Sequence, residues 1–536
     1  MKKKLFSAVA LLMVCCMVLG ACGSSQSSSG STDSTAAGAT ESGSEGSEES
    51  SAVTTTKDTI TIALAEDPGK LDVDTLTGNP YLGLFDMVGE CLMQLSSDGE
   101  YEPALMESWE LDEDGMGVTA YLRQGVLFHN GNEMTAEIVQ KDILYVSTTG
   151  TYSSTFSYID AENIEVIDTY TLHIPFNEVS GGWMTGMVGW YVFDYDAYEE
   201  QGDTFWQAPV TTSPYYVSDW VSGDSITMTA FEDYWNGTPV IQTLVFRVIS
   251  ETSVALMELS TGGVDVVFNL NNEDAFSIDS SDGSGVEMYE VSGNTEIYVG
   301  MNNSKEALSD IRVRQAIAYA VDRDTILAGP FNGGAELMYS IIGSHAFGYV
   351  DTYEEENWPY QYDPDKAKEL LEEAGYADGL TLSIVVDSTP VRRLIAEQMN
   401  NMLAEVGITL DIQQVDFATA GDILNNTNDY DLYIRGATVC TGDAYAGLIN
   451  DAVFGLCKMT EVDGYDEYKE LLDTLSQTLD EEGRKEVYAQ VQDYFISSGM
   501  YWLPIATQTI YVLANDSLQN LEITNGYLHY ENSYFN

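Results

Sequence analysis

Residues 380–415 read LTLSIVVDSTPVRRLIAEQMNNMLAEVGITLDIQQV, and this stretch decides the fold class. Residues 380–386 and 408–415 are short apolar runs of strand length. Between them, residues 390–406 repeat apolar side chains every three or four positions, and Gly407 ends that pattern. A strand, a helix and a strand in this order form a βαβ unit with a right-handed crossover. The stretch therefore predicts an α/β protein.

Elements of the same kinds flank this unit. Asp363 and Pro364 fit the N-cap and first position of another helix. Ser309 is expected to cap an earlier helix that stops at residues 329–330. Residues 430–434 predict a further strand.

Residues 99–205 follow a different pattern. They contain short strand-like runs such as 117–122 and 164–167, and Asp-Gly or Asn-Gly turns join several of them. Such turns between alternating runs are typical of antiparallel strands. This region therefore predicts a meander.

The N-terminal residues predict export and anchoring. Three lysines at 2–4 precede an apolar stretch, 5–19, that is shorter than the roughly 20 residues of a membrane-spanning helix. The tetrapeptide Leu-Gly-Ala-Cys that ends at Cys22 resembles the lipobox of bacterial lipoproteins. Residues 23–57 are mostly Ser, Gly, Thr, Ala and Glu, a composition typical of a disordered tether. We expect a lipid anchor on Cys22 at the extracytoplasmic face of the cell membrane; the alternative is a secretory signal with a chance cysteine.

Composition excludes several partners. The chain has 86 acidic and 21 basic residues, a net charge of −65 that repels nucleic acid. A disulfide is permitted outside the membrane, and Cys440 with Cys457 is the expected pair, leaving Cys91 as a buried thiol. No paired-cysteine or histidine cluster indicates a metal or other cofactor.

Arg392 and Arg393 are the first candidate binding residues. They fall in the first turn of the helix that starts near residue 390, where cations oppose the helix dipole. Helix N–H groups beside a guanidinium suit a carboxylate, and ligands tend to lie at the carboxyl end of a strand. The alternative is surface salt bridges to the many acidic residues, and both interpretations stay open.

Asp443 is the second candidate. It follows the strand 430–434 by a glycine-containing loop, so we expect it at the same edge of the sheet. An acid and a base facing one cleft would bind a zwitterion, such as a free peptide, at both ends. The alternative is an aspartate that closes a turn. The motifs of hydrolases, phosphate-binding loops and zinc enzymes are absent from the sequence, so no catalytic residue is predicted.

Other stretches carry a family resemblance. They are EPALMESW (102–109), FHNG (128–131), SDIRVRQAIAYAVDR (309–323) and YDPDKAKELLEEAGY (362–376). With them the chain, from about residue 59 onward, resembles the solute-binding proteins of ABC transporters, family 5, the peptide and nickel class.

The resemblance implies a type II periplasmic-binding fold, in which two hinged lobes close on a ligand and lobe 1 carries an extra subdomain. It also implies delivery to an ABC permease and its ATPase subunits. The implied division is a signal peptide (1–21), an anchor and linker (22–57), lobe 1 (58–98, 206–295 and 507–536), the extra subdomain (99–205) and lobe 2 (296–506).

The resemblance also implies roles for the candidate residues. In similar dipeptide binders, an arginine of a pair like Arg392 and Arg393 holds the peptide carboxylate, and the aspartate of a Trp-Thr-Gly-Asp stretch holds the amine. Here that stretch keeps Asp443 but has Cys440 in place of tryptophan. We expect a short peptide in the interlobe cleft. The alternatives are another solute (an oligosaccharide, a nickel chelate or a signalling peptide) or an extracellular hydrolase.

Overall fold

The computed structural model describes residues 55–76, 81, 83–96, 99–281, 283–344, 346–438, 456–459, 464–524 and 526–536. Cys22, Cys440 and Asp443 lie outside these residues, as does the predicted signal peptide. Within the described ranges, no helix combines the length and apolarity needed to cross a membrane.

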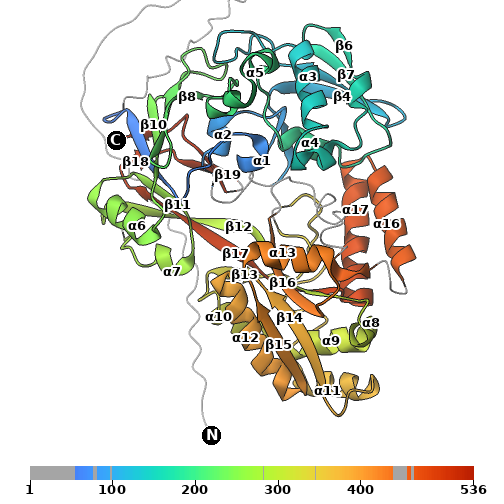
Figure 1. The fold of residues 1–536 in the computed structure, drawn as a ribbon. Coiled ribbons are helices and arrows are strands. Elements are labelled where there is room, and N and C mark those ends of the chain that lie inside the picture. The colour runs from blue at the N-terminus through green and yellow to red at the C-terminus, as the bar shows by residue number, and fades with distance from the viewer. Residues whose placement is uncertain are drawn as a thin grey trace, which may run out of the picture. The chain divides into compact units, whose positions relative to one another are not determined.

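One large sheet of eleven strands runs through the protein (Figure 1). Ten of its strands form a continuous path, and the eleventh, β13 (Ala335–Leu337), pairs with β17. The path is β15 (Ile408–Gln414), β14 (Leu380–Val386), β16 (Leu432–Thr438), β12 (Val286–Met301), β17 (Trp502–Asn515), β11 (Val266–Leu270), β1 (Thr59–Leu64), β10 (Thr243–Val248), β9 (Ser225–Ala230) and β8 (Tyr215–Val221).

The long strands β12 and β17 join the two halves of this sheet. They pair antiparallel from Val286 opposite Asn515 to Gly300 opposite Trp502. On its other edge β12 pairs with β16, whereas β17 pairs with β11. The β12–β17 register shifts between Val291 and Thr295 and again after Ile297, and such irregularities bend and twist a strand pair locally.

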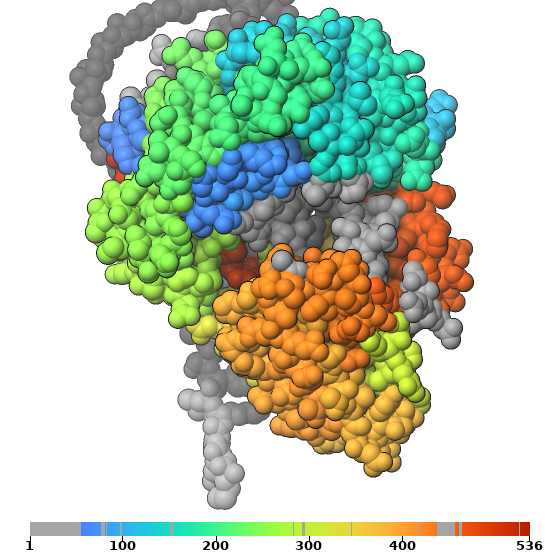
Figure 2. Space-filling model, viewed as in Figure 1, coloured from blue at the N-terminus to red at the C-terminus, as the bar shows by residue number. Residues whose placement is uncertain are grey.

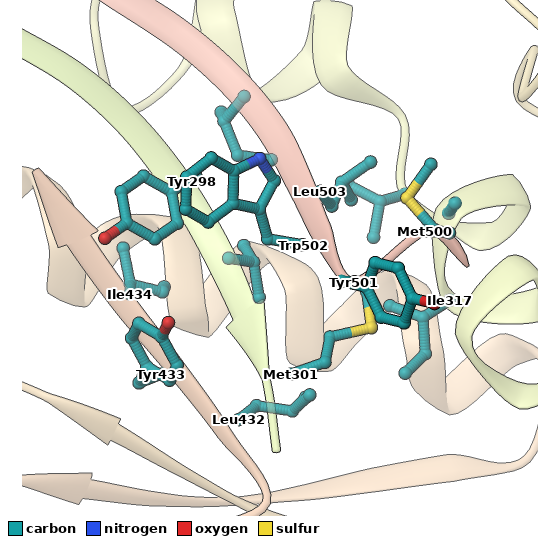
Figure 3. Close-up of a cluster of buried hydrophobic side chains, with 14 of the residues drawn as sticks. Tyr298, Met301, Ile317, Leu432, Tyr433, Ile434, Met500, Tyr501, Trp502 and Leu503 are labelled. Carbon is teal, nitrogen blue, oxygen red and sulfur yellow. The ribbon is translucent and has the colours of Figure 1, made fainter. Parts of the chain in front are cut away.

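Two large hydrophobic cores lie on either side of this junction. One core is built from buried residues between Ile297 and Ala506, and the other from residues between Ile60 and Phe268 together with Val512 to Phe535. Figure 3 shows side chains of the first core, with Tyr298 and Trp502 packed together. The predicted lobe boundaries fall inside β12 and β17, and this division stays a prediction.

The βαβ unit forms as the sequence predicts. Strands β14 and β15 pair in parallel, from Leu380 opposite Ile408 to Val386 opposite Gln414. Between them α12 (Pro390–Glu405) buries its apolar face. The preceding helix α11 (Pro364–Glu373) begins at the predicted cap, because the Asp363 side chain accepts from the Lys366 N–H.

The expected helix capped by Ser309 is wrong in detail. The segment forms three helices, α8 (Glu306–Ser309), α9 (Ile311–Ala320) and α10 (Arg323–Ala328). Asp310 and Asp322 cap the last two, since each side chain accepts a backbone N–H of the first turn. A periodic apolar pattern continues across such a break and conceals it.

The region predicted as a meander forms a separate four-stranded antiparallel sheet, but its strands are not all neighbours in chain order. Its order is β4 (Met106–Leu111), β5 (Gly117–Leu122), β7 (Thr171–Pro175) and β6 (Glu165–Asp168), and α3 (Ala136–Val146) contacts β6 and β7. The other elements used below are α1 (Val73–Leu76), α2 (Phe85–Val88), β2 (Met93–Leu95), α13 (Phe417–Asn426), α16 (Tyr465–Gln477), α17 (Glu481–Asp493), β19 (Glu522–Thr524) and β20 (Tyr527–His529).

A second junction joins the helices α16 and α17 to the meander region (Figure 1). The backbone N–H of Gly181 donates to the carbonyl of Ser476 at 2.6 Å. Lys485 of α17 also lies 3.4 Å from the carboxylate of Glu100. The region of the four-stranded sheet and the region of α16 and α17 are therefore joined by this smaller contact, in addition to the connection through the strands β12 and β17.

Gly300 offers a test of the packing where β12 crosses the first core. A Cβ added there would lie 2.0 Å from the ring of Tyr433 on β16. We expect Gly300→Ala to lower the free energy of unfolding by about 1–3 kcal/mol through overpacking. Gly421→Ala in α13 is the control, since open space surrounds that position and alanine favours a helix by up to about 1 kcal/mol. Urea unfolding measures the stability of both variants. The packing of Gly300 against Tyr433 would be contradicted if Gly300→Ala were as stable as Gly421→Ala.

Candidate functional site

The candidate site lies at the carboxyl ends of β14 and β16. These strands pair in parallel, so both end at the same edge of the sheet. β14 leads through Asp387 into the N-terminus of α12. In α/β sheets this is the edge at which ligands bind. Figure 2 shows the surface recessed between the segment that carries α1 and α2 and the segment that carries α13.

Arg392 lies in the first turn of α12 and is nearly buried. Its guanidinium donates to the carboxylate of Asp387, and the two side chains are 12% and 5% exposed. The Nε–H of Arg392 is buried without a hydrogen-bond partner. The guanidinium lies against β16 at Gly436, because a Cβ there would be 2.6 Å from Nη2.

Arg393 has a different environment. It donates to Glu397 one turn later on α12 at 2.5 Å, and both side chains are exposed at 36% and 50%. A pair of this kind contributes little to stability. The structure therefore separates the two arginines: Arg393 has the surface salt bridge that was one of the two interpretations, whereas Arg392 is held inside the protein.

Arg435 is a functional candidate that the sequence interpretation missed. It lies on β16 directly opposite Tyr298 of β12, and its Nη1 is buried without a hydrogen-bond partner. No motif marks it. The available signal was a charged residue within an otherwise apolar strand, which requires a partner when it is buried.

Aromatic rings form a wall beside these arginines. Tyr298 packs on Trp502 with ring centroids 4.3 Å apart (Figure 3). The Tyr298 hydroxyl is buried without a hydrogen-bond partner. Burial raises the pKa of Tyr298, and the positive charges of Arg435 and Arg392 oppose that shift. Both guanidinium groups therefore act on the same hydroxyl.

Glu296 lies two residues before Tyr298 and is 5% exposed. Its carboxyl accepts the Gly343 N–H at 2.5 Å. Burial raises the pKa of Glu296 to about 8. At neutral pH this group is therefore mostly protonated and adds little negative charge to the cluster.

Together these residues suit anion binding. Two guanidinium groups each have a buried nitrogen without a hydrogen-bond partner, and one of them, Arg392, lies at the N-terminus of α12. In the part of the chain that the structure describes, no group of three or more His, Cys, Asp or Glu side chains is placed to hold a metal ion.

The predicted disulfide between Cys440 and Cys457 is wrong. Cys457 is a buried free thiol whose Sγ lies 3.2 Å from the Tyr433 hydroxyl. Spacing in the sequence could not reveal that contact. Cys91 is also free, but it is half-buried and not fully buried as expected.

A separate hollow of about 350 Å³ lies among α2, β2, β19, β20 and the segment around Trp235. It contains Asp86 and Glu90, and burial raises their pKa values to about 6 and about 7. All its lining residues belong to the part of the chain outside 237–521, so it does not include the arginine cluster. Its acidic lining is the opposite of what a carboxylate needs.

Comparisons with known proteins show the family of this chain. Residues 100–452 match the sequence profile described as bacterial extracellular solute-binding proteins, family 5 Middle. Heme-binding protein A of Haemophilus influenzae is 25% identical over 529 residues, which cover 91% of this chain and 92% of that protein. The dipeptide-binding protein of Escherichia coli is 25% identical over 432 residues, which cover 73% and 78% of the two chains.

A solved structure shows the same architecture. HbpA2 from Haemophilus parasuis superposes with a TM-score of 0.78 at 24% identity, covering 89% of this chain and all of that one (100%). This confirms the predicted type II periplasmic-binding fold. The arginine cluster lies on residues between β12 and β17 in the chain.

Glu296 provides a test by pH. The folded protein keeps a proton on Glu296 that the unfolded chain loses, so the resulting stabilisation is present below about pH 4.5 and is lost as pH rises towards 8. Glutamine at position 296 cannot ionise but can still accept the Gly343 N–H. As the pH rises from 5 to 8, the free energy of unfolding of Glu296→Gln, measured with urea, should increase by roughly 3 kcal/mol relative to that of the unmodified protein. The control is Glu397→Gln on the exposed face of α12; an equal gain there would refute the assignment.

Proposed function

Because this chain belongs to the bacterial extracellular solute-binding proteins of family 5, we propose that it captures short peptides between its lobes and delivers them to an ABC importer. The observation that carries the proposal is that the guanidinium groups of Arg392 and Arg435 each have a buried nitrogen without a hydrogen-bond partner. A buried donor without a partner costs free energy, and a ligand carboxylate would remove that cost.

The carboxylate end of the peptide would lie at the edge of lobe 2. Arg435 and the Nε–H of Arg392 would donate to it, beside the wall of Tyr298 and Trp502. Tyr298 and Trp502 are 2% and 4% exposed, so this wall supports the arginines from within the core. Asp443, which follows β16 in the chain, would hold the peptide amine, and Cys440 would leave room where similar proteins have tryptophan.

Closure would follow from ligand contacts with both lobes. A ligand that contacts both lobes binds the closed arrangement more tightly and shifts the population towards it. The bend in the β12–β17 ladder near Thr295 is where the two lobes would move relative to each other. The adjacent Glu296 holds Gly343 of lobe 2, so this part of lobe 2 would move together with the strand.

The relatives support a small ligand with acidic groups. One of them is named a dipeptide-binding protein, and this is the ligand class that suits the arginine cluster. Another is named heme-binding protein A and covers more of this chain. Heme also carries carboxylates, so hemin is the competing ligand that a binding experiment must include.

We expect native mass spectrometry to show retention of peptides from a pool of di- to pentapeptides. Arg435→Gln should weaken binding at least tenfold, because one guanidinium partner of the carboxylate is lost. Arg247→Gln is the matched control: Arg247 pairs with Glu258 in the other lobe, and its side chain is 39% exposed. Retention of hemin but of no peptide would contradict the proposal, as would equal effects of the two substitutions.

Anchoring through Cys22 is tested separately. Bacterial cells producing the full chain should retain it in the membrane fraction, because several acyl chains on one cysteine give stable attachment. Cys22→Ser should release the protein into the soluble extracytoplasmic fraction, while Ser24→Ala, a substitution in the tether, should leave it in the membrane. Membrane retention of Cys22→Ser would show that Cys22 carries no anchor.

A further inference from the structure

We propose that Asp387 sets the charge that the site accepts, and that the site therefore selects ligands with one carboxylate at this end over ligands with two. The inference rests on the proposed function and concerns the same arginine cluster. It assigns a specificity role to a residue that does not itself need to contact the ligand.

Asp387 satisfies the charge of Arg392 from within the chain. Its carboxylate accepts from the Arg392 guanidinium, and its second oxygen accepts the Thr389 N–H at 2.9 Å. Asp387 is 5% exposed and Arg392 is 12% exposed, so water screens this pair only weakly. Arg392 therefore presents to a ligand an ion pair without net charge, in which the buried Nε–H has no hydrogen-bond partner.

Arg435 keeps its charge available. Among the described residues, no carboxylate lies within ion-pairing distance of its guanidinium, and Nη1 is buried without a hydrogen-bond partner. Its neighbour across the ladder is Tyr298, which brings no negative charge. Glu296, opposite Ala437 on the same strand pair, is mostly protonated at neutral pH.

The cluster consequently offers one net positive charge. One ligand carboxylate would balance it, and the Arg392 Nε–H would satisfy one further lone pair. A second carboxylate at the same place would be removed from water without a counter-charge, and such burial is unfavourable. Releasing Arg392 from Asp387 would supply the missing counter-charge.

The experiment uses two peptide pools that differ by one charge. Both pools contain di- to pentapeptides. Every peptide of the first pool ends in glutamine, and every peptide of the second ends in glutamate. The last residue therefore has the same shape in both pools but carries one carboxylate in the first and two in the second. The pools compete for the purified protein, and native mass spectrometry gives the ratio of bound glutamate-ending to glutamine-ending peptides.

The unmodified protein should favour the glutamine pool. Asp387→Asn keeps the size of the side chain and its hydrogen bond with Thr389 but removes the charge, so the ratio should move towards glutamate at least tenfold. Asp473→Asn, which breaks an exposed pair with Lys469 on α16, should leave the ratio unchanged. A third pool that ends in glutamine amide tests Arg435: Arg435→Gln should abolish the preference for glutamine over its amide.

The outcomes separate the two proposals. If the unmodified protein retains no peptide from any pool, peptide capture itself is refuted, and this inference with it. If peptides bind but Asp387→Asn leaves the ratio unchanged, or lowers binding of both pools equally, only charge selection by Asp387 is refuted. If Asp387→Asn does not fold, Arg435→Gln decides: an unchanged preference for glutamine over its amide would show that the charge of Arg435 is not what the ligand meets.

Discussion

The antiparallel ladder between β12 and β17 is the constraint on which the rest of the structure depends. It is the part of the large sheet that joins β16 on one side to β11 on the other, and its two ends contribute residues to the two large hydrophobic cores. Backbone hydrogen bonds along a strand pair resist stretching but permit twisting, especially where the register is irregular. The two halves of the sheet are therefore joined by a ladder that can twist.

The same ladder also positions the chemistry. Tyr298 lies on β12 and packs on Trp502 of β17, and Arg435 lies opposite Tyr298 on β16. Three adjacent strands therefore bring the two aromatic rings and one cation together. The fourth contributor, Arg392, comes from the helix that follows β14 and is held by Asp387. Strands and helix ends hold side chains more rigidly than loops do, and a rigid site loses less entropy when it binds.

Much of the fold could be predicted from the sequence, because local patterns dictate it. The run 380–415 predicted β14, α12 and β15 within two residues at each end, and Asp363 capped its helix as expected. The split of the helix after Ser309 was missed, because Asp310 and Asp322 interrupt a pattern that stays periodic.

The candidate site could be predicted less well. Arg392 and Arg393 share a sequence signal, yet one is buried against Asp387 and the other is exposed beside Glu397. Their difference depends on which face of α12 meets β16, which no local pattern states. Arg435 was missed for the same reason: its importance comes from pairing with Tyr298, a residue far away in the chain.

The glycine at position 436 has a consequence for comparing this chain with its relatives. The guanidinium of Arg392 occupies the volume in which any other residue would place its first side-chain carbon. A methyl group there would displace the arginine and separate it from Asp387 without altering either residue. In a relative with a larger residue at this position, an arginine at the start of the helix would therefore not indicate the same ligand chemistry. When sequences are compared, the residue at position 436 should be examined before the arginine.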